Sequence, residues 1–262
     1  MNRGIVFFDF DGTLVDETAR IYRPTAATKE ALRQLKENGY LAVLATGRAK
    51  CYVPETGIAW DGYVTSNGAH AELCGEEIFD RCMPDELVKM IIDNADRYKY
   101  IFVAENQEKC YTNGLDNEHF LSSLSFFDIP MSVFRPVSEA DGARVHKMFL
   151  TFESEAVYDA VSSELGEFFS FSRHRTNLSC DVDMAGISKG AAISKMAEAA
   201  GVSIADTYAF GDNSNDYEML KAVGTGIAMG AHSPDIEEVC SFVTKTVAEE
   251  GISYGLRHAG LI

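Results

Sequence analysis

Two aspartates, Asp9 and Asp11, follow the apolar run Ile5-Val6-Phe7-Phe8, flank one aromatic residue and precede Gly12. Acids at this spacing can attack an electrophile, exchange protons or hold a hard metal ion. A run this apolar predicts a buried strand, so acids at its end point toward a cleft. An ordinary strand-to-loop exit explains Asp and Gly equally well. The ends of later elements decide between the two interpretations.

Three further polar groups follow at such ends: Thr46-Gly47, Lys189, and the stretch from Asp212 to Asp216. Each has a plain structural explanation, as a turn, a solvated helix start, and a loop in which Asn215 caps the next helix. All four groups together are hard to explain by chance, because ligands of parallel α/β sheets bind beyond the carboxyl ends of the strands. We therefore predict one shared site.

The combined residue types suit phosphoryl transfer. A carboxylate such as Asp9 can attack phosphorus and form an aspartyl-phosphate. Carboxylate and phosphate about 4 Å apart repel by roughly 4 kcal/mol per charge pair at an effective dielectric near 20. A Mg²⁺ ion on hard oxygen ligands and a nearby ammonium, that of Lys189, would cancel this cost.

Asp9, Asp11 and Asp212 are the expected metal ligands. Asp11 is placed to protonate the leaving alcohol and later to activate water, so we expect it to bind metal through its backbone carbonyl. Thr46 and the amides near Gly47 and Asp11 are expected to hold phosphate oxygens.

The elements around these groups alternate between strand and helix. We expect strands at 4–10, 41–45 and 62–65, with a helix between the first two that begins at Thr25 or Thr28 and stops at Gly39. The rhythm resumes with a helix at 189–200 stopped by Gly201, a strand at 207–210 and short strands at 226–229 and 242–244. This order predicts an α/β fold with a doubly wound, Rossmann-like parallel sheet.

The middle of the chain does not follow this alternation of strands and helices. A hairpin at 69–79 precedes helices near 84–96, 116–124 and 155–165 and strands near 100–104, 109–112, 145–152, 168–171 and 177–182. We predict an inserted α/β domain at 83–183 and a core domain formed by 1–82 and 184–262. His146 and Lys147 are expected at the surface, and Trp60 in the core domain. Arg173, His174 and Arg175 form a basic cluster that could meet an anionic group or simply be a solvated turn.

Four stretches in order carry a family resemblance: Asp9-Phe10-Asp11-Gly12-Thr13-Leu14, Ala45-Thr46-Gly47-Arg48, Ser188-Lys189-Gly190 and Gly211-Asp212-Asn213-Ser214-Asn215-Asp216. They resemble the motifs of the haloacid dehalogenase-like (HAD) superfamily of phosphatases. The insert between the second and third motifs looks like the α/β cap of the Cof-like, type IIB branch, as do Ser66-Asn67-Gly68-Ala69 and Glu249-Glu250-Gly251-Ile252.

The resemblance implies a role for each matching residue. Asp9 is the nucleophile and Asp11 the general acid/base. The phosphate contacts are Thr46, Gly47, Lys189, Asn215 and the Phe10 backbone. Asp212 completes the Mg²⁺ shell, joined by Asn213, and Asp216 orients the loop. One departure, Asp181 and Asp183 before Gly186, concerns the substrate contacts of the cap and not the chemistry.

Composition limits the partners and the compartment. The chain has 262 residues and a formal net charge of −17, a surface that repels nucleic acids and anionic membranes. It has no apolar run near 18 residues and no signal-peptide pattern. The six cysteines, without a CxxC pair, read as reduced core thiols of a cytoplasmic protein. We expect a monomer or small homo-oligomer that meets a small phosphorylated metabolite.

These residues predict a Mg²⁺-dependent hydrolase of small phosphomonoesters, with sugar phosphates as the expected substrates. A phosphotransferase or phosphomutase of the same superfamily is an alternative, since a second sugar can replace water as the acceptor. Two further alternatives are a phospho-accepting signalling domain and an inactive sugar-phosphate binder. The long insert and the acceptor on the first strand argue against the signalling domain, and the intact motifs argue against the inactive binder.

Overall fold

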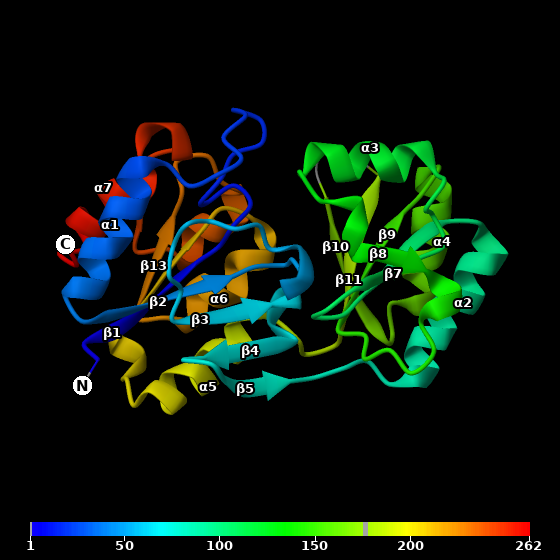
Figure 1. The fold of residues 1–262 in the computed structure, drawn as a ribbon, viewed down its shortest axis with the longest axis horizontal. Helices are drawn as coiled ribbons and strands as arrows, with labels where there is room; N and C mark the ends of the chain where they lie inside the picture. The colour runs from blue at the N-terminus through cyan, green and yellow to red at the C-terminus, as the bar shows by residue number, and fades with distance from the viewer. Residues whose placement is uncertain (1, 175–177) are drawn as a thin grey trace. The chain divides into compact units, whose positions relative to one another are not determined.

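The computed structural model describes residues 2–174 and 178–262, and the chain divides into two compact units (Figure 1). The core unit comprises Met1–Gly47, Pro54–Asp80 and Ser188–Ile262. The cap unit comprises Arg48–Val53 and Arg81–Ile187. The domain boundaries drawn from the sequence, at residues 83 and 183, stay a prediction, and the sequence did not indicate that residues 48–53 belong with the insert.

The core unit is built on one sheet with the strand order β14-β13-β12-β1-β2-β3-β4-β5. Its strands from β14 to β3 pair in parallel, whereas β4 and β5 form an antiparallel hairpin at one edge. The strands are β1 (Gly4–Phe8), β2 (Tyr40–Ala45), β3 (Gly62–Thr65), β4 (His70–Leu73), β5 (Glu76–Asp80), β12 (Thr207–Gly211), β13 (Thr225–Ala228) and β14 (Phe242–Val243). The predicted α/β fold with a doubly wound parallel sheet is confirmed.

The helices of the core unit cover both faces of this sheet. They are α1 (Ala26–Glu37), α5 (Lys189–Ala200), α6 (Tyr217–Ala222) and α7 (Gly251–His258). Ile5 and Phe7 of β1 pack with residues of α5 and α6. Helices α1 and α7 contact each other (Figure 1). Strands with apolar residues on both faces are typical of parallel sheets. Trp60 packs as expected, with its ring 6.0 Å from that of Phe8.

Helix ends follow the predicted chemistry. Thr25 is the N-cap of α1, because its hydroxyl accepts a hydrogen bond from the Thr28 amide at 3.1 Å. Gly201 ends α5 in the left-handed conformation that glycine adopts without strain. The first strand is shorter than predicted and ends at Phe8, so Asp9 already lies in the loop beyond it.

The cap unit has its own sheet, with the strand order β10-β11-β9-β6-β7-β8. Its strands are β6 (Ile101–Glu105), β7 (Cys110–Thr112), β8 (Phe134–Pro136), β9 (Lys147–Thr151), β10 (Phe169–Arg173) and β11 (Ser179–Met184), and its helices are α2 (Asp85–Tyr98), α3 (Glu118–Phe126) and α4 (Glu155–Leu165). Helices α2 and α4 pack on one face, while α3 and residues 49–52 contribute to the cluster on the other. Strand β8 was not predicted. The predicted strand start at Asn177 and the basic residue Arg175 lie outside the described residues.

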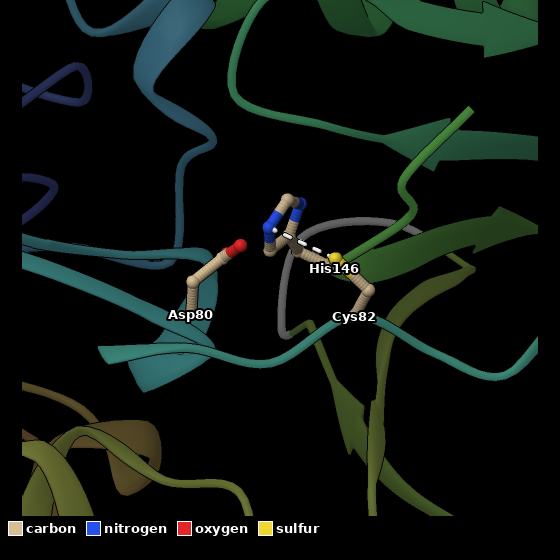
Figure 2. A group of neighbouring side chains, drawn as sticks. All are labelled: Asp80, Cys82 and His146. Atoms are coloured by element: carbon tan, nitrogen blue, oxygen red, sulfur yellow. Dashed lines mark hydrogen bonds between the residues drawn. The ribbon is translucent and has the colours of Figure 1, made fainter. Parts of the chain in front are cut away.

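His146 and Lys147 are buried, at 4% and 3% exposure, so the expectation that they lie at the surface is wrong. Figure 2 shows the His146 ring beside Cys82, with Nε2 3.5 Å from the thiol sulfur. The Lys147 ammonium lies 2.7 Å from Asp181 Oδ1 and 3.5 Å from Glu105 Oε1. Neighbouring strands carry these acids, and the local sequence at 146–147 does not reveal that pairing.

The cysteines are free thiols in this structure, and the expectation that all of them lie in a core is wrong. Cys110 and Cys180 are buried, Cys51, Cys82 and Cys240 are half-buried, and Cys74 is exposed at the turn of the β4–β5 hairpin. In the described part of the chain, no helix combines the length and the apolar character that crossing a membrane requires.

Candidate active site

One buried lysine joins two of the predicted motifs. The Lys189 ammonium, with no exposed surface, donates to Asp9 Oδ1 at 2.5 Å and to Asp216 Oδ1 at 2.6 Å. Asp9 is 4% exposed and Asp216 is fully buried. A buried charge that is shielded from water needs an oppositely charged partner. Here the Lys189 ammonium and the two carboxylates are partners for each other.

The sheet topology explains why residues 180 positions apart meet. Strand β1 pairs with β12 on one side and β2 on the other, and the Asp9 amide extends the pairing by donating to the Phe210 carbonyl at 3.0 Å. Lys189 is the first residue of α5, whose N-cap Ser188 accepts from the Ala191 amide. Parallel strands place their carboxyl ends at one edge of the sheet, and the Asp9 side chain lies at that edge.

A glycine in the loop after β3 packs closely against the start of α5. Gly68 has φ +98°, and a Cβ there would lie 2.2 Å from the Ser188 carbonyl oxygen. Asn67 before it also has a positive φ, of 52°. Only glycine at position 68 allows this approach, so the loop supports the backbone that carries Lys189.

Asp216 organises the loop that follows β12. Its Oδ2 accepts hydrogen bonds from the amides of Asp212 at 2.9 Å and Asn213 at 3.1 Å, while its Oδ1 accepts from Lys189. The Asn213 side chain in turn accepts from the Asp216 backbone, and this bond and the one from the Asn213 amide to Asp216 form a capping box. The Asn213 side chain also accepts from the Ser214 amide at 2.9 Å. Asp216 therefore uses both carboxylate oxygens to hold this loop and the lysine. Asn215, in the same loop, is half-buried.

Thr13 and Gly12 position Asp212, which sequence reasoning did not foresee. The buried Thr13 hydroxyl donates to Asp212 Oδ1 at 3.0 Å. Gly12 has φ +87°, and a Cβ there would lie 2.2 Å from Asp212 Oδ2. The only signal in the sequence was the position of both residues directly after the two aspartates. Any side chain at position 12 would displace the Asp212 carboxylate.

Asp11 lies half-buried in the tight turn after β1. The Phe10 carbonyl accepts from the amides of Leu14 at 2.9 Å and Val15 at 3.1 Å, and the Phe10 ring is buried. A further bridge links Asp11 with Val15. The backbone around the two aspartates is thus fixed by hydrogen bonds within the turn.

Thr46 and Gly47 follow β2. Thr46 is fully buried, and its amide donates to the Val64 carbonyl at 2.8 Å. Because this amide already has an acceptor, any phosphate contact of Thr46 would fall to its side chain. Gly47 is half-buried and is the last residue of its segment of the core unit.

The charges of the cluster are unbalanced. Burial, followed by repulsion from Asp216, raises the pKa of Asp9 to about 7. Burial and the charges of Asp9 and Asp216 hold the pKa of Asp212 well above its usual value. Burial alone would lower the pKa of Lys189, but the neighbouring carboxylates of Asp216 and Asp9 overcome this effect and raise it.

The donor set fits a divalent cation with hard oxygen ligands. Carboxylate oxygens of Asp9, Asp212 and Asp216 lie within 4.8 Å of one another. When all three carboxylates are ionised, they exceed the one ammonium of Lys189 by two negative charges in this described cluster. The space that a Cβ of Gly12 would fill lies directly against Asp212. Of the four predicted metal ligands, Asp9 and Asp212 belong to this cluster; Asp11 and Asn213 lie in the two adjoining loops.

Comparison with known proteins agrees with this geometry. The family model of haloacid dehalogenase-like hydrolases matches residues 6–256. YkrA of Bacillus subtilis strain 168, named as a candidate phosphatase, is 30% identical over 273 residues, covering 100% of both chains. A match of this extent includes both units and all four motifs.

Two further relatives are named for particular phosphates. YcsE of Bacillus subtilis strain 168, a 5-amino-6-(5-phospho-D-ribitylamino)uracil phosphatase, is 25% identical over 97% of this chain and 94% of its own. The solved structure of the HAD subclass IIB sugar phosphatase BT4131 is 27% identical, with a TM-score of 0.84 over 99% of this chain and 100% of its own. The resemblance read from the motifs is confirmed, and the chain belongs to the haloacid dehalogenase-like hydrolases, in their Cof-like phosphatase branch.

Proposed function

We propose that this protein is a Mg²⁺-dependent phosphatase that hydrolyses small phosphomonoesters through a phosphoryl group held on Asp9. The observation that carries the proposal is the buried contact of Lys189 with Asp9 and Asp216. It places a fixed ammonium beside the one carboxylate that directly follows the central strand.

Asp9 is the proposed nucleophile. One of its oxygens accepts from Lys189, which fixes the direction of the carboxylate. Attack of Asp9 on phosphorus forms an acyl phosphate and releases the alcohol; water then attacks the same phosphorus and frees Asp9. Lys189 also faces the phosphoryl oxygens in this scheme and offsets their charge.

Asp9, Asp212 and the Asp11 carbonyl, with Asn213, would hold the Mg²⁺ ion. When bound, the ion neutralises the excess negative charge of the cluster and favours the ionised form of Asp9. Thr13 and Gly12 contribute by keeping the Asp212 carboxylate in one position.

Asp11 is the proposed general acid and base. Its side chain gives a proton to the leaving alcohol oxygen in the first step and takes one from water in the second. The phosphate contacts in this scheme are the Thr46 side chain, Gly47, Lys189, Asn215 and the Phe10 backbone.

Sugar phosphates are the proposed substrates. BT4131 is named a sugar phosphatase, which supports this choice, while YcsE, a similarly distant relative, is named for a ribityl phosphate attached to a uracil. Their shared chemistry is a small phosphomonoester of a polyol or sugar.

The test is phosphate release from a panel of phosphorylated metabolites, with Mg²⁺ and with a chelator. We expect release that needs Mg²⁺ and falls by about 10⁴-fold or more in Asp9→Asn. Asp93→Asn, an exposed residue of α2 paired with Lys89, is the matched control and should keep full activity. Undiminished release by Asp9→Asn would overturn the assignment of the nucleophile.

A second variant separates the roles of the two aspartates. Asp11→Asn should slow turnover far more than it weakens Mg²⁺ binding, since only its side chain exchanges protons and its carbonyl remains. Comparable losses in both quantities would mean that the Asp11 carboxylate is itself a metal ligand.

A further inference from the structure

Residues 48–53, the segment that follows the Thr46-Gly47 motif, are hydrogen-bonded to three parts of the cap unit: β6, the loop after β6 and the residue after α3. The Arg48 guanidinium donates to the Phe127 carbonyl at 3.2 Å, and the Lys50 amide donates to Gln107 Oε1 at 3.2 Å. The Tyr52 hydroxyl donates to Glu105 Oε2 at 2.7 Å. We call this segment the strap.

The strap places one thiol against another. Cys51 Sγ lies 3.7 Å from Cys110 Sγ, at the start of β7, and 3.4 Å from the Asn106 carbonyl oxygen. Cys51 is half-buried, whereas Cys110 has no exposed surface. A disulfide has a sulfur–sulfur distance of about 2.05 Å, so these two sulfurs need to approach by only about 1.7 Å.

We propose that Cys51 and Cys110 form a reversible disulfide when the protein meets a hydroperoxide, a modification that bonds the strap covalently to the cap sheet. This inference does not depend on the proposed phosphatase activity. It rests on the contact between the two sulfurs and on the difference in their exposure.

The exposure sets the order of the two steps. The partly accessible Cys51 sulfur attacks one peroxide oxygen, the O–O bond breaks, and the departing hydroxide takes up a proton as water. Cys51 then carries a sulfenic acid. The Cys110 sulfur attacks the Cys51 sulfur, the S–O bond breaks, and the hydroxide leaves as water with the Cys110 proton. The two sulfurs lose two electrons, and the peroxide gains them.

Cys110 suits the second role. Its hydrogen bond with Cys51, together with burial, raises the pKa of the Cys110 thiol well above its usual value, so it stays protonated and resists direct oxidation. The sulfur of Cys51 is its neighbour in the structure, which makes the sulfenic acid of Cys51 its natural target.

The remaining cysteines serve as internal comparisons. Cys74 is exposed on a hairpin turn, Cys82 contacts His146, and Cys180 is buried in the cap core. Among the described thiols, only Cys51 and Cys110 have their sulfurs in contact. Access alone would therefore favour oxidation of Cys74, whereas proximity favours the strap pair.

The experiment treats the full chain with a small excess of hydrogen peroxide and counts thiols after denaturation. We expect the count to fall from six to four and to return to six with dithiothreitol. Trypsin cuts after Lys50, Arg81, Lys109 and Arg144, so the predicted link joins peptides 51–81 and 110–144. Because peptide 51–81 also carries Cys74, the peptide map is made in Cys74→Ser, which should still form the link.

Cys51→Ser and Cys110→Ser are the matched variants. Cys110→Ser should retain a sulfenic acid at Cys51 that a dimedone probe labels, and Cys51→Ser should lose no buried thiol. Oxidation confined to Cys74, a disulfide between two chains, or a Cys51 sulfinic acid in the unmutated protein without the 51–110 link would each overturn the proposal.

Discussion

The core unit and the cap unit each bury one lysine between two acids, and the two clusters differ in what holds them. Lys189 in the core unit joins a residue beyond β1 with a residue of the loop after β12. Lys147 in the cap unit lies within a sheet, directly opposite Glu105 of β6 in the strand register. Its other partner, Asp181, belongs to β11 on the opposite side of β9.

This difference fits a structural role for the Lys147 cluster and the catalytic role proposed for the Lys189 cluster. Strands on both sides of Lys147 fix its partners through the ladder of backbone hydrogen bonds. The Lys189 cluster lies where strands have ended, so its loops can present oxygens to a ligand. The core cluster also has a third carboxylate, that of Asp212, which fits the Mg²⁺ ion proposed for this site.

Replacing each lysine gives the largest expected contrast. Lys189→Met and Lys147→Met should each lose about 3–5 kcal/mol of stability, because each leaves buried carboxylates without a counter-charge. Millimolar Mg²⁺ should recover part of that loss in Lys189→Met only. Urea unfolding with and without Mg²⁺ measures both effects. If Mg²⁺ restored the same amount of stability to both variants, the two clusters would not differ in metal binding.

The acid of the cap cluster predicts a pH dependence. Burial raises the pKa of Glu105 from 4.5 to about 7, despite the nearby Lys147. The folded state therefore holds a proton that the unfolded state releases, so this contribution to stability is present below pH 4.5 and is lost as pH rises through 7. The loss amounts to about 3 kcal/mol.

Glu105→Gln isolates this effect. The free energy of unfolding of the unmutated protein should fall relative to the variant between about pH 4.5 and pH 7. Gln can still accept the Tyr52 hydroxyl bond, so the pH profile and not the stability at one pH is the measurement. Parallel profiles would show that Glu105 stays ionised in the fold.

Gly12→Ala tests the core cluster without removing a charge. The added Cβ would collide with the Asp212 carboxylate, so we expect Mg²⁺ activation to weaken by about 10–100-fold. Gly75→Ala is the control, because Gly75 also has a positive φ, of +84°, but no atom within 4 Å of a Cβ. Titration of activity with Mg²⁺ compares them, and equal Mg²⁺ affinity in the two variants would exclude the contact.

The smallest expected effect comes from one hydroxyl in each unit. Thr13→Val removes the donor to Asp212 and should weaken Mg²⁺ activation by roughly tenfold. Thr112→Val removes a donor to the Phe102 carbonyl in the cap unit and should cost about 1 kcal/mol of stability with unchanged Mg²⁺ activation. A Mg²⁺ response that shifts equally in both variants would show that Thr13 only supports the fold.

The core fold and the family were predictable because their signals are local. Apolar runs predict strands, Thr25 and Gly201 mark helix ends, and the polar groups beyond the strands point to one edge of a parallel sheet. The roles of the individual site residues stay predictions, although Lys189, Asp9 and Asp212 do lie together.

What could not be predicted depends on pairs distant in sequence. The hydrogen bond from Thr13 to Asp212 spans 199 positions, and the sequence around Thr13 does not indicate this partner. The burial of Lys147 follows from the register of β9 against β6 and β11, which alternating residues within β9 do not reveal. The strap was missed for the same reason, because its partners in the cap lie more than 50 residues further on.

The pairing of β1 with β12 also determines when the core sheet can form while the chain is being synthesised on the ribosome. The cap sheet uses a continuous stretch, from β6 to β11, whereas the core sheet needs strands from both ends of the chain. Roughly 200 residues separate β1 from β12, a wait of about 10–40 s at ordinary rates of synthesis. The apolar strand Gly4–Phe8 therefore emerges long before its second neighbour, and the cap unit can fold while the core is still unfinished.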